Sequence, residues 1–205
     1  MIYTLSKNLV LLFISLLFKK KIIFTDPAAL DSGNYLYMSN HITLFDPFFV
    51  GAQIKKKIFF MGKKELFRNP LFAWYFRQIH AFPVDRKGFS RSALETALEL
   101  LKKGESVLLF PEGTRSKTED FGQPKPGPGM LVARSGAGVI PVYVRLDKKI
   151  RLRPRANGLL IVYGKPLHFK TESGENNDIE KKDYYNNIIT GVMNEIRSLK
   201  EKYSG

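Results

Sequence analysis

His41 and Asp46 are the residues whose types and spacing best fit acid–base chemistry. They lie in the segment S-N-H-I-T-L-F-D-P at 39–47, between two short apolar runs. Residues five apart are rotated by about 140° on an ideal helix, so these side chains meet only if the chain turns between them. Because Asp46 precedes Pro47, a pair typical of a helix start, we expect Asp46 to cap a helix and His41 to lie in the loop before it.

Such a pair predicts a general base. A carboxylate bound to one imidazole nitrogen fixes the tautomer and stabilises the protonated ring, which leaves the other nitrogen free to take a proton from a hydroxyl group. The alternative is that Asp46 only caps a helix and that His41 is an ordinary loop histidine. Spacing alone favours this alternative, so a second feature of the sequence has to decide between them.

A second polar segment, F-P-E-G-T-R-S at 110–116, continues from the apolar run S-V-L-L. It places an acid, a glycine and a guanidinium group at the end of an expected strand, as Glu112, Gly113 and Arg115. Glycine permits close approach of the backbone, and arginine makes paired hydrogen bonds to phosphate oxygens. The segment therefore predicts an anion site, although a polar turn with a surface arginine explains the same residues equally well.

The composition narrows the chemistry further. The sequence holds 33 Lys and Arg against 19 Asp and Glu, and the net charge of +14 favours a polyanionic partner: a nucleic acid, an anionic membrane or a phosphorylated substrate. The absence of cysteine from the sequence excludes disulfides, thiolate zinc sites and cysteine nucleophiles. The three histidines lack the paired spacing of zinc motifs, so no metal is expected.

Short apolar runs alternate with helical patterns along the rest of the chain, which predicts an α/β fold. We expect one domain at 22–205 with a mixed sheet and flanking helices. Apolar residues recur at helical spacing in the segment 92–101, and the tail 178–203 carries them on one helical face. The expected strands are 21–24, 35–39, 58–61, 106–110, 139–145 and 159–163.

The first 18 residues are largely apolar, but Lys7 and Asn8 interrupt them, and the uninterrupted run from Leu9 is short for a membrane span. Three lysines follow this run at positions 19–21. We expect residues 1–21 to form a membrane-anchoring helix that lies in the interface, with these lysines at anionic lipid headgroups. The alternative is a soluble helix that packs on the core of the domain.

Taken together, these segments resemble the glycerolipid acyltransferase family, typified by 1-acyl-sn-glycerol-3-phosphate acyltransferases. The family's N-H-x-x-x-x-D and F-P-E-G-T-R-S motifs are complete here and stand in the family's order. The segment 80–86 resembles its second motif, with Arg86 in place but His80 where the family usually has glycine. A V-I-P-V run and a K-K-E-L segment that begins at Lys63 also look like parts of the family pattern, and the resemblance covers roughly residues 35–170.

The resemblance implies that His41 removes the proton of an acceptor hydroxyl, which attacks the thioester carbonyl of an acyl donor, while Asp46 orients and charges the base. No covalent acyl-enzyme is required, and the sequence offers neither a G-x-S-x-G serine nor a cysteine for one. The donor is acyl-CoA or acyl carrier protein as co-substrate, with no bound cofactor. The residues implied to hold the acceptor's glycerol phosphate are Lys63, Arg86, Glu112, Gly113, Thr114 and Arg115.

The acceptor implied first is 1-acylglycerol 3-phosphate, whose acylation gives phosphatidic acid for phospholipid biosynthesis. Glycerol 3-phosphate, another lysophospholipid and a lipid amine stay open as acceptors. A basic nucleic-acid-binding protein explains the net charge but not the motifs, since the sequence carries no RNA- or DNA-binding signature. We therefore expect a membrane-associated enzyme, peripheral or monotopic on the cytoplasmic face, with no nucleic-acid partner.

Overall fold

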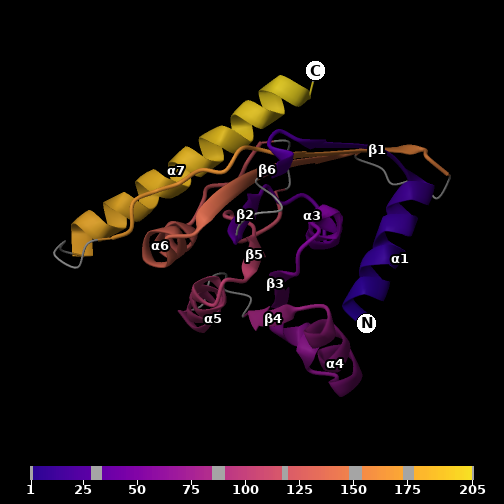
Figure 1. The fold of residues 1–205 in the computed structure, drawn as a ribbon, viewed down its shortest axis with the longest axis horizontal. Coiled ribbons are helices and arrows are strands. Elements are labelled where there is room, and N and C mark those ends of the chain that lie inside the picture. Colours follow the sequence, from indigo (N-terminus) through magenta and orange to yellow (C-terminus); the bar gives the residue numbers. More distant parts are fainter. Residues whose placement is uncertain are drawn as a thin grey trace.

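The computed structural model of the chain contains a central β-sheet with helices on both of its faces (Figure 1). The structure describes residues 2–28, 34–84, 91–116, 120–147, 154–172 and 178–204. The strands of this part of the chain are β1 Phe18–Phe24, β2 Tyr35–Ser39, β3 Ile58–Lys63, β4 Ala81–Val84, β5 Ser106–Leu109, β6 Gly138–Leu146 and β7 Asn157–Tyr163. Its helices are α1 Ile2–Leu17, α3 Asp46–Gln53, η1 Lys64–Phe67 (a 3-10 helix), α4 Pro70–Gln78, α5 Arg91–Lys102, α6 Pro126–Ser135 and α7 Asp178–Tyr203.

The sheet is mixed, with the strand order β1-β7-β6-β2-β5-β3-β4. Strand β2 lies between β5 and β6 and runs parallel to both, and β3 and β4 continue the parallel part beyond β5. Strands β6 and β7 form the antiparallel pair, and β1 pairs in parallel with β7 at the outer edge. The expectation of one α/β domain with a mixed sheet and flanking helices is therefore confirmed.

Strands β2 and β5 are buried on both faces, and their residues are largely apolar, as is typical of parallel strands covered by helices. Leu36 and Met38 of β2 point into a core formed with α5, α6 and α7. Tyr35 and Tyr37 of the same strand point into a second core, formed with α1 and α3. Figure 1 shows these two groups of helices on opposite sides of the sheet, with α4 next to β4 and near the N-terminal end of α1.

The N-terminal helix is joined to the domain more closely than we expected. Helix α1 ends at Leu17, and β1 begins at Phe18, so the expected boundary after residue 21 falls inside a strand. Ile14 of α1 and Phe18 of β1 are buried in the second core, where the Phe18 ring packs edge-on to Phe49 at 5.3 Å. The boundary was missed because the run of lysines at 19–21 occupies exposed positions of an edge strand and hides its pattern.

Four elements of the described chain escaped the sequence analysis, namely η1, α4, β4 and α6. Strand β4 has only four residues and contains Pro83, which weakens any strand pattern. Helix α6 begins with P-G-P-G, which is typical of a loop, yet Gly129 is needed there because a Cβ at this position would lie 2.1 Å from the Tyr185 carbonyl oxygen of α7. Among the described helices, none combines the length and the apolar character that crossing a membrane requires.

Candidate active site

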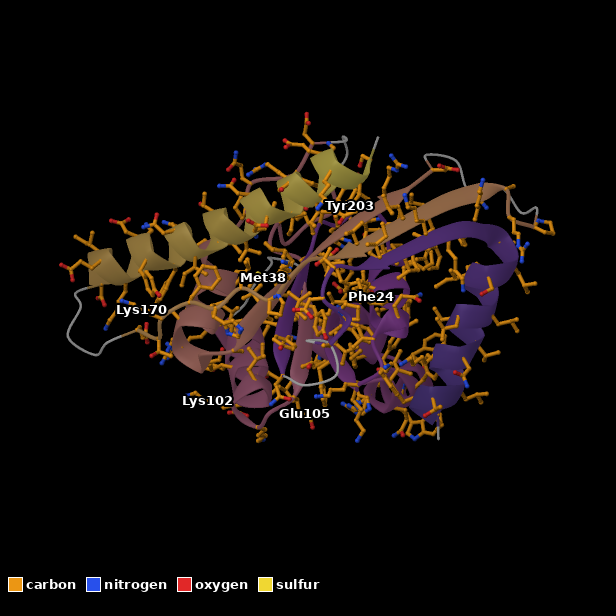
Figure 2. All side chains as sticks on the ribbon, turned by 45° about the horizontal axis from the view of Figure 1, so that its top comes forward. Phe24, Met38, Lys102, Glu105, Lys170 and Tyr203 are labelled. Carbon is orange, nitrogen blue, oxygen red and sulfur yellow. The ribbon has the colours of Figure 1, made fainter. Side chains whose placement is uncertain are left out.

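The carboxyl ends of β2, β5, β3 and β4 lie at one edge of the sheet because these strands are parallel. Ligands of α/β sheets bind at such an edge. His41 follows the end of β2, Glu112 follows the end of β5, and Lys63 is the last residue of β3. Figure 2 shows Met38, in the carboxyl half of β2, well separated from Lys102 and Glu105, which precede β5 at the other edge.

His41 and Asp46 form the predicted pair. Nδ1 of His41 lies 2.8 Å from Oδ2 of Asp46, and the side chains are 17% and 0% exposed, respectively. Because a carboxylate only accepts hydrogen bonds, Nδ1 carries the proton and Nε2 is the basic nitrogen. Within the described residues, no hydrogen bond occupies Nε2. The pair thus offers an accessible base backed by a buried carboxylate.

The sequence analysis expected Asp46 to cap helix α3. The structure corrects this, because Asp46 is the first residue of the helix and Phe45 is at the cap position. Its carboxylate turns back to the loop and accepts hydrogen bonds from the backbone N–H groups of Ile42 (2.6 Å) and Thr43 (2.8 Å) and from the Thr43 hydroxyl (2.6 Å). These donors supply hydrogen-bond partners for both oxygens of the buried carboxylate. The same contacts fold the loop into the turn that brings His41 to Asp46.

The F-P-E-G-T-R-S segment holds His41 from the other side. The backbone N–H of His41 donates to Oε1 of Glu112 (3.2 Å), and the backbone N–H of Ser116 donates to the carbonyl oxygen of His41 (2.8 Å). The His41 ring stacks on Phe110, with 4.1 Å between the ring centroids. Residues about 70 positions apart in the chain therefore fix both the backbone and the ring plane of the base.

Glu112 is only 3% exposed, and both of its oxygens accept backbone hydrogen bonds. Oε2 accepts from the N–H of Gly122 at 2.7 Å, so the side chain joins the His41 loop to the segment before α6. Burial raises the pKa of the Glu112 carboxyl, and the two backbone hydrogen bonds act in the opposite direction. This placement leaves little carboxylate surface for the acceptor that the sequence analysis expected Glu112 to hold.

The other expected acceptor-binding residues surround this point. Gly113 has φ of +69° and closes a tight turn through a hydrogen bond from its N–H to the Phe110 carbonyl oxygen (2.9 Å). Thr114 and Arg115 are exposed beyond the turn, and Lys63 is exposed at the end of β3. Arg86 lies outside the described residues.

His80, at the start of the expected second motif, has φ of +64°. This left-handed conformation explains why the family pattern has glycine there, since it disfavours most side chains. The His80 ring compensates by packing at 4.8 Å on Tyr3 of α1 and at 4.8 Å on Phe59 of β3. Burial is the first cause of its lowered pKa, and the nearby charge of Lys57 adds to it.

Asn40 is a site residue whose role the sequence analysis did not identify, although the N-H-x-x-x-x-D motif contains it. Its buried amide accepts from the Val144 N–H (2.7 Å) and donates to the Val144 carbonyl oxygen (2.9 Å). This paired contact fastens the start of the His41 loop to β6. The partner lies 104 residues away in the sequence, so no local signal pointed to it.

An apolar pocket opens between α1, α3, β3 and α4. Pro47 and Phe48, at the start of α3, line it together with Val10, Phe60 and Ile79. Pro47, which follows Asp46 in the chain, is one of its lining residues, whereas His41 and Asp46 are not.

The fold and the site define an α/β domain built around a histidine–aspartate pair at the carboxyl edge of its sheet. The chain belongs to the family described as Acyltransferase, whose model matches residues 21–145.

The relatives of the chain carry consistent names. It is 34% identical over 140 residues to the 1-acyl-sn-glycerol-3-phosphate acyltransferase of Bacillus subtilis, which covers 67% of this chain and 68% of that one. It is 35% identical over 120 residues to the Streptococcus pneumoniae protein of the same name, covering 58% of this chain and 44% of that one. The chain thus spans less than half of the pneumococcal relative.

A solved structure shares the fold. The crystal structure of the 1-acyl-sn-glycerophosphate acyltransferase from Thermotoga maritima superimposes with a TM-score of 0.63 at 23% identity, covering 97% of this chain and 78% of that one.

Proposed function

We propose that the protein transfers a fatty acyl group from an acyl thioester to the free hydroxyl of 1-acylglycerol 3-phosphate and so makes phosphatidic acid. The observation that carries this proposal is the 2.8 Å pair between His41 and Asp46 at the carboxyl edge of the sheet, where no described residue occupies Nε2 of His41. The names of the relatives support the acceptor, and the family supports the reaction class.

In this reaction Nε2 of His41 takes the proton of the acceptor hydroxyl as its oxygen attacks the thioester carbonyl carbon. The new C–O bond forms and the C–S bond breaks, and the thiolate leaves with the proton that the imidazolium returns. Asp46 accepts from Nδ1 throughout and stabilises the imidazolium while it exists. Its buried position beside backbone donors keeps the carboxylate in place without help from solvent.

The acceptor's phosphate suits the cations and the turn next to the base. Arg115 immediately precedes Ser116, whose N–H donates to the His41 carbonyl oxygen, so the backbone of Arg115 lies next to that of the base. We place the glycerol phosphate between Arg115, the Gly113–Thr114 turn and Lys63, with Arg86 as a further cation. We assign Glu112 to holding the His41 loop instead, because its two oxygens are occupied by backbone donors.

The apolar pocket between α1, α3, β3 and α4 is the site that we assign to the acyl chain. Acyl-CoA and acyl carrier protein both present the same thioester to this site, and a direct comparison of the two donors decides between them.

Attachment to a membrane surface is part of the proposal, with α1 as the main contact. The helix exposes a row of large apolar side chains, and α4 adds another beside it, because the Tyr75 hydroxyl bonds the Ser6 hydroxyl at 3.1 Å. The exposed apolar residues of the two helices are Leu5, Leu9, Leu12, Phe13, Leu16, Leu71, Phe72, Trp74 and Tyr75. Such an apolar surface can insert at the headgroup level of the cytoplasmic leaflet. The net charge of +14 attracts the protein to the anionic lipids there.

The test offers the purified protein one acyl-CoA and a set of acceptors: 1-acylglycerol 3-phosphate, glycerol 3-phosphate, 1-acylglycerophosphocholine and a long-chain amine. Mass spectrometry identifies the products. We expect phosphatidic acid to form fastest, and we expect none from His41→Ala. Faster acylation of any other acceptor would contradict the proposed acceptor, and equal turnover in His41→Ala would contradict the reaction site.

A further inference from the structure

Lys125 lies against the turn of the F-P-E-G-T-R-S segment, although it is outside every motif of the sequence. A Cβ built on Gly113 would lie 3.3 Å from Cε and 3.4 Å from Nζ of Lys125, so the lysine side chain crosses the glycine face. The backbone N–H of Lys125 donates to the Pro111 carbonyl oxygen at 3.0 Å, which fixes the start of this side chain. The residue is half-buried.

The Lys125 ammonium and the Arg115 guanidinium have no hydrogen bond or ion pair with any residue, within the part of the chain that the structure describes. The nearby acid, Glu112, does not serve them, because its oxygens accept from His41 and Gly122. A half-buried cation without an acceptor is costly, so its position favours an anionic ligand. Lys125 also precedes α6, whose N-terminal dipole adds positive potential at the same point.

We propose that Lys125 binds the phosphate of the acceptor together with Arg115, and that the phosphate lies over the glycine face of Gly113. The inference rests on the proposed function, because it needs a phosphorylated acceptor. In 1-acylglycerol 3-phosphate the phosphate and the free hydroxyl are on adjacent carbons, so the phosphate site must lie next to the base. The turn meets this requirement, since Glu112 and Ser116 on either side of it bind the His41 backbone.

Gly113 has two reasons to be glycine in this arrangement. Its φ of +69° disfavours other residues, and a side chain would press on Lys125 and cover the space that the phosphate needs.

The experiment compares Lys125→Met, Lys125→Gln and Lys125→Arg with a matched control, Lys102→Met. Lys102 is exposed at the end of α5, before β5 and so at the other edge of the sheet (Figure 2). For each variant, kcat and the KM values for acyl-CoA and 1-acylglycerol 3-phosphate are measured in detergent micelles, with Tm as the check on folding.

We expect Lys125→Met and Lys125→Gln to raise KM for the phosphorylated acceptor roughly tenfold or more, the size of a lost charge-assisted hydrogen bond. KM for acyl-CoA and kcat should stay within about threefold, because the base and its partner are untouched. Lys125→Arg should keep the acceptor KM within about threefold, and Lys102→Met should match the wild type. If Lys125→Met lowers Tm, the contrast between Gln and Arg still decides the role of the charge.

An unchanged acceptor KM in folded Lys125→Gln overturns the role of Lys125 while the proposed function stands. So does an equal rise of both KM values, which indicates a structural effect. If the wild type itself does not acylate 1-acylglycerol 3-phosphate, the proposed function fails and the Lys125 site fails with it. The wild-type acceptor assay therefore separates the two failures.

Discussion

The two faces of the sheet differ in what their helices leave exposed. Of the 13 large apolar side chains that are exposed among the described residues, 12 lie on α1, the His41 loop, η1 and α4, and Ile179 on α7 is the exception. The face under α5, α6 and α7 carries its apolar residues inward, so those helices stabilise the domain. The face under α1, α3 and α4 also presents apolar surface outward and holds the pocket, so its helices have a task beyond stability.

The candidate active site lies at the carboxyl edge of the sheet, and the largest expected effect is there. We expect His41→Ala to lower kcat at least about 100-fold, the usual contribution of a positioned general base, and to leave Tm close to that of the wild type. His168→Ala is the matched control, because His168 lies beside Gly138 at the start of β6 and, among the described residues, has no hydrogen bond or ring contact with His41 or Asp46. A smaller loss in His41→Ala than in the control would remove His41 from catalysis.

Glu112→Gln tests whether the buried carboxylate holds the His41 loop to the segment before α6. The two backbone N–H groups bind different oxygens of Glu112, and glutamine replaces one of these oxygens by an NH2 group. That NH2 group then faces one of the two N–H groups, which loses its acceptor. We expect kcat to fall roughly tenfold and the free energy of unfolding to fall by about 1 to 3 kcal/mol, the cost of an unsatisfied buried group.

The KM for the acceptor distinguishes positioning from binding at Glu112. The acceptor KM should stay within about twofold if the Glu112 side chain only holds the His41 loop. The control is Glu99→Gln, an exposed residue of α5, which should change neither kcat nor stability. A large rise in acceptor KM with unchanged kcat would instead restore the binding role that the motif first implied.

A third pair of variants sharpens the contrast between the faces themselves. Replacing Leu5, Leu9 and Leu12 of α1 by serine removes exposed apolar surface without touching the buried Ile14. At about 25 cal/mol per Å², three such side chains contribute a few kcal/mol to interfacial binding, so the fraction that sediments with anionic vesicles should fall several-fold. Ile179→Ser, on the other face, is the control and should sediment like the wild type.

Point substitutions are preferable to deleting residues 1–21, because the deletion would also remove four residues of β1 together with Ile14 and Phe18 of the core. Full sedimentation of the α1 variant at physiological salt would place the membrane contact on α4 or on basic loops instead.

The sequence predicted the parts of the site that are local in the chain. The turn between His41 and Asp46 is closed by residues within five positions, so its chemistry is written in one segment. The restraints on that turn come from Glu112 and Val144, which are 71 and 104 positions from their partners, and a single sequence carries no signal for such pairs. Strand β4 and helix α6 escaped for a related reason, since packing against neighbours overrides the Pro83 and P-G-P-G signals that oppose them.

The smallest expected effect concerns His80, which joins α1 to β3 on the pocket face. Replacement by glycine relieves the positive φ, worth about 1 kcal/mol, but loses two ring contacts of about 0.5 to 1.5 kcal/mol each. The losses outweigh the gain, so we expect His80→Gly to lower the free energy of unfolding by about 1 kcal/mol. His80→Asn keeps a residue that tolerates this φ and separates the backbone effect from the ring contacts. Greater stability in His80→Gly would mean that the ring contacts contribute little.

The pH dependence of stability gives a second check on His80. Burial and the charge of Lys57 lower its pKa in the folded protein, and the charge of Glu105 partly offsets them. Between the folded pKa and the ordinary value of 6.5, the unfolded chain binds more protons than the folded one. The contribution of neutral His80 to the free energy of unfolding is therefore fully present above pH 6.5 and is lost as the pH falls toward the folded pKa. The difference in unfolding free energy between the wild type and His80→Asn should shrink over this range, measured by urea unfolding at several pH values. A difference that stays constant from pH 7 downward would show that His80 does not titrate differently in the folded protein, and that its ring contributes by packing alone.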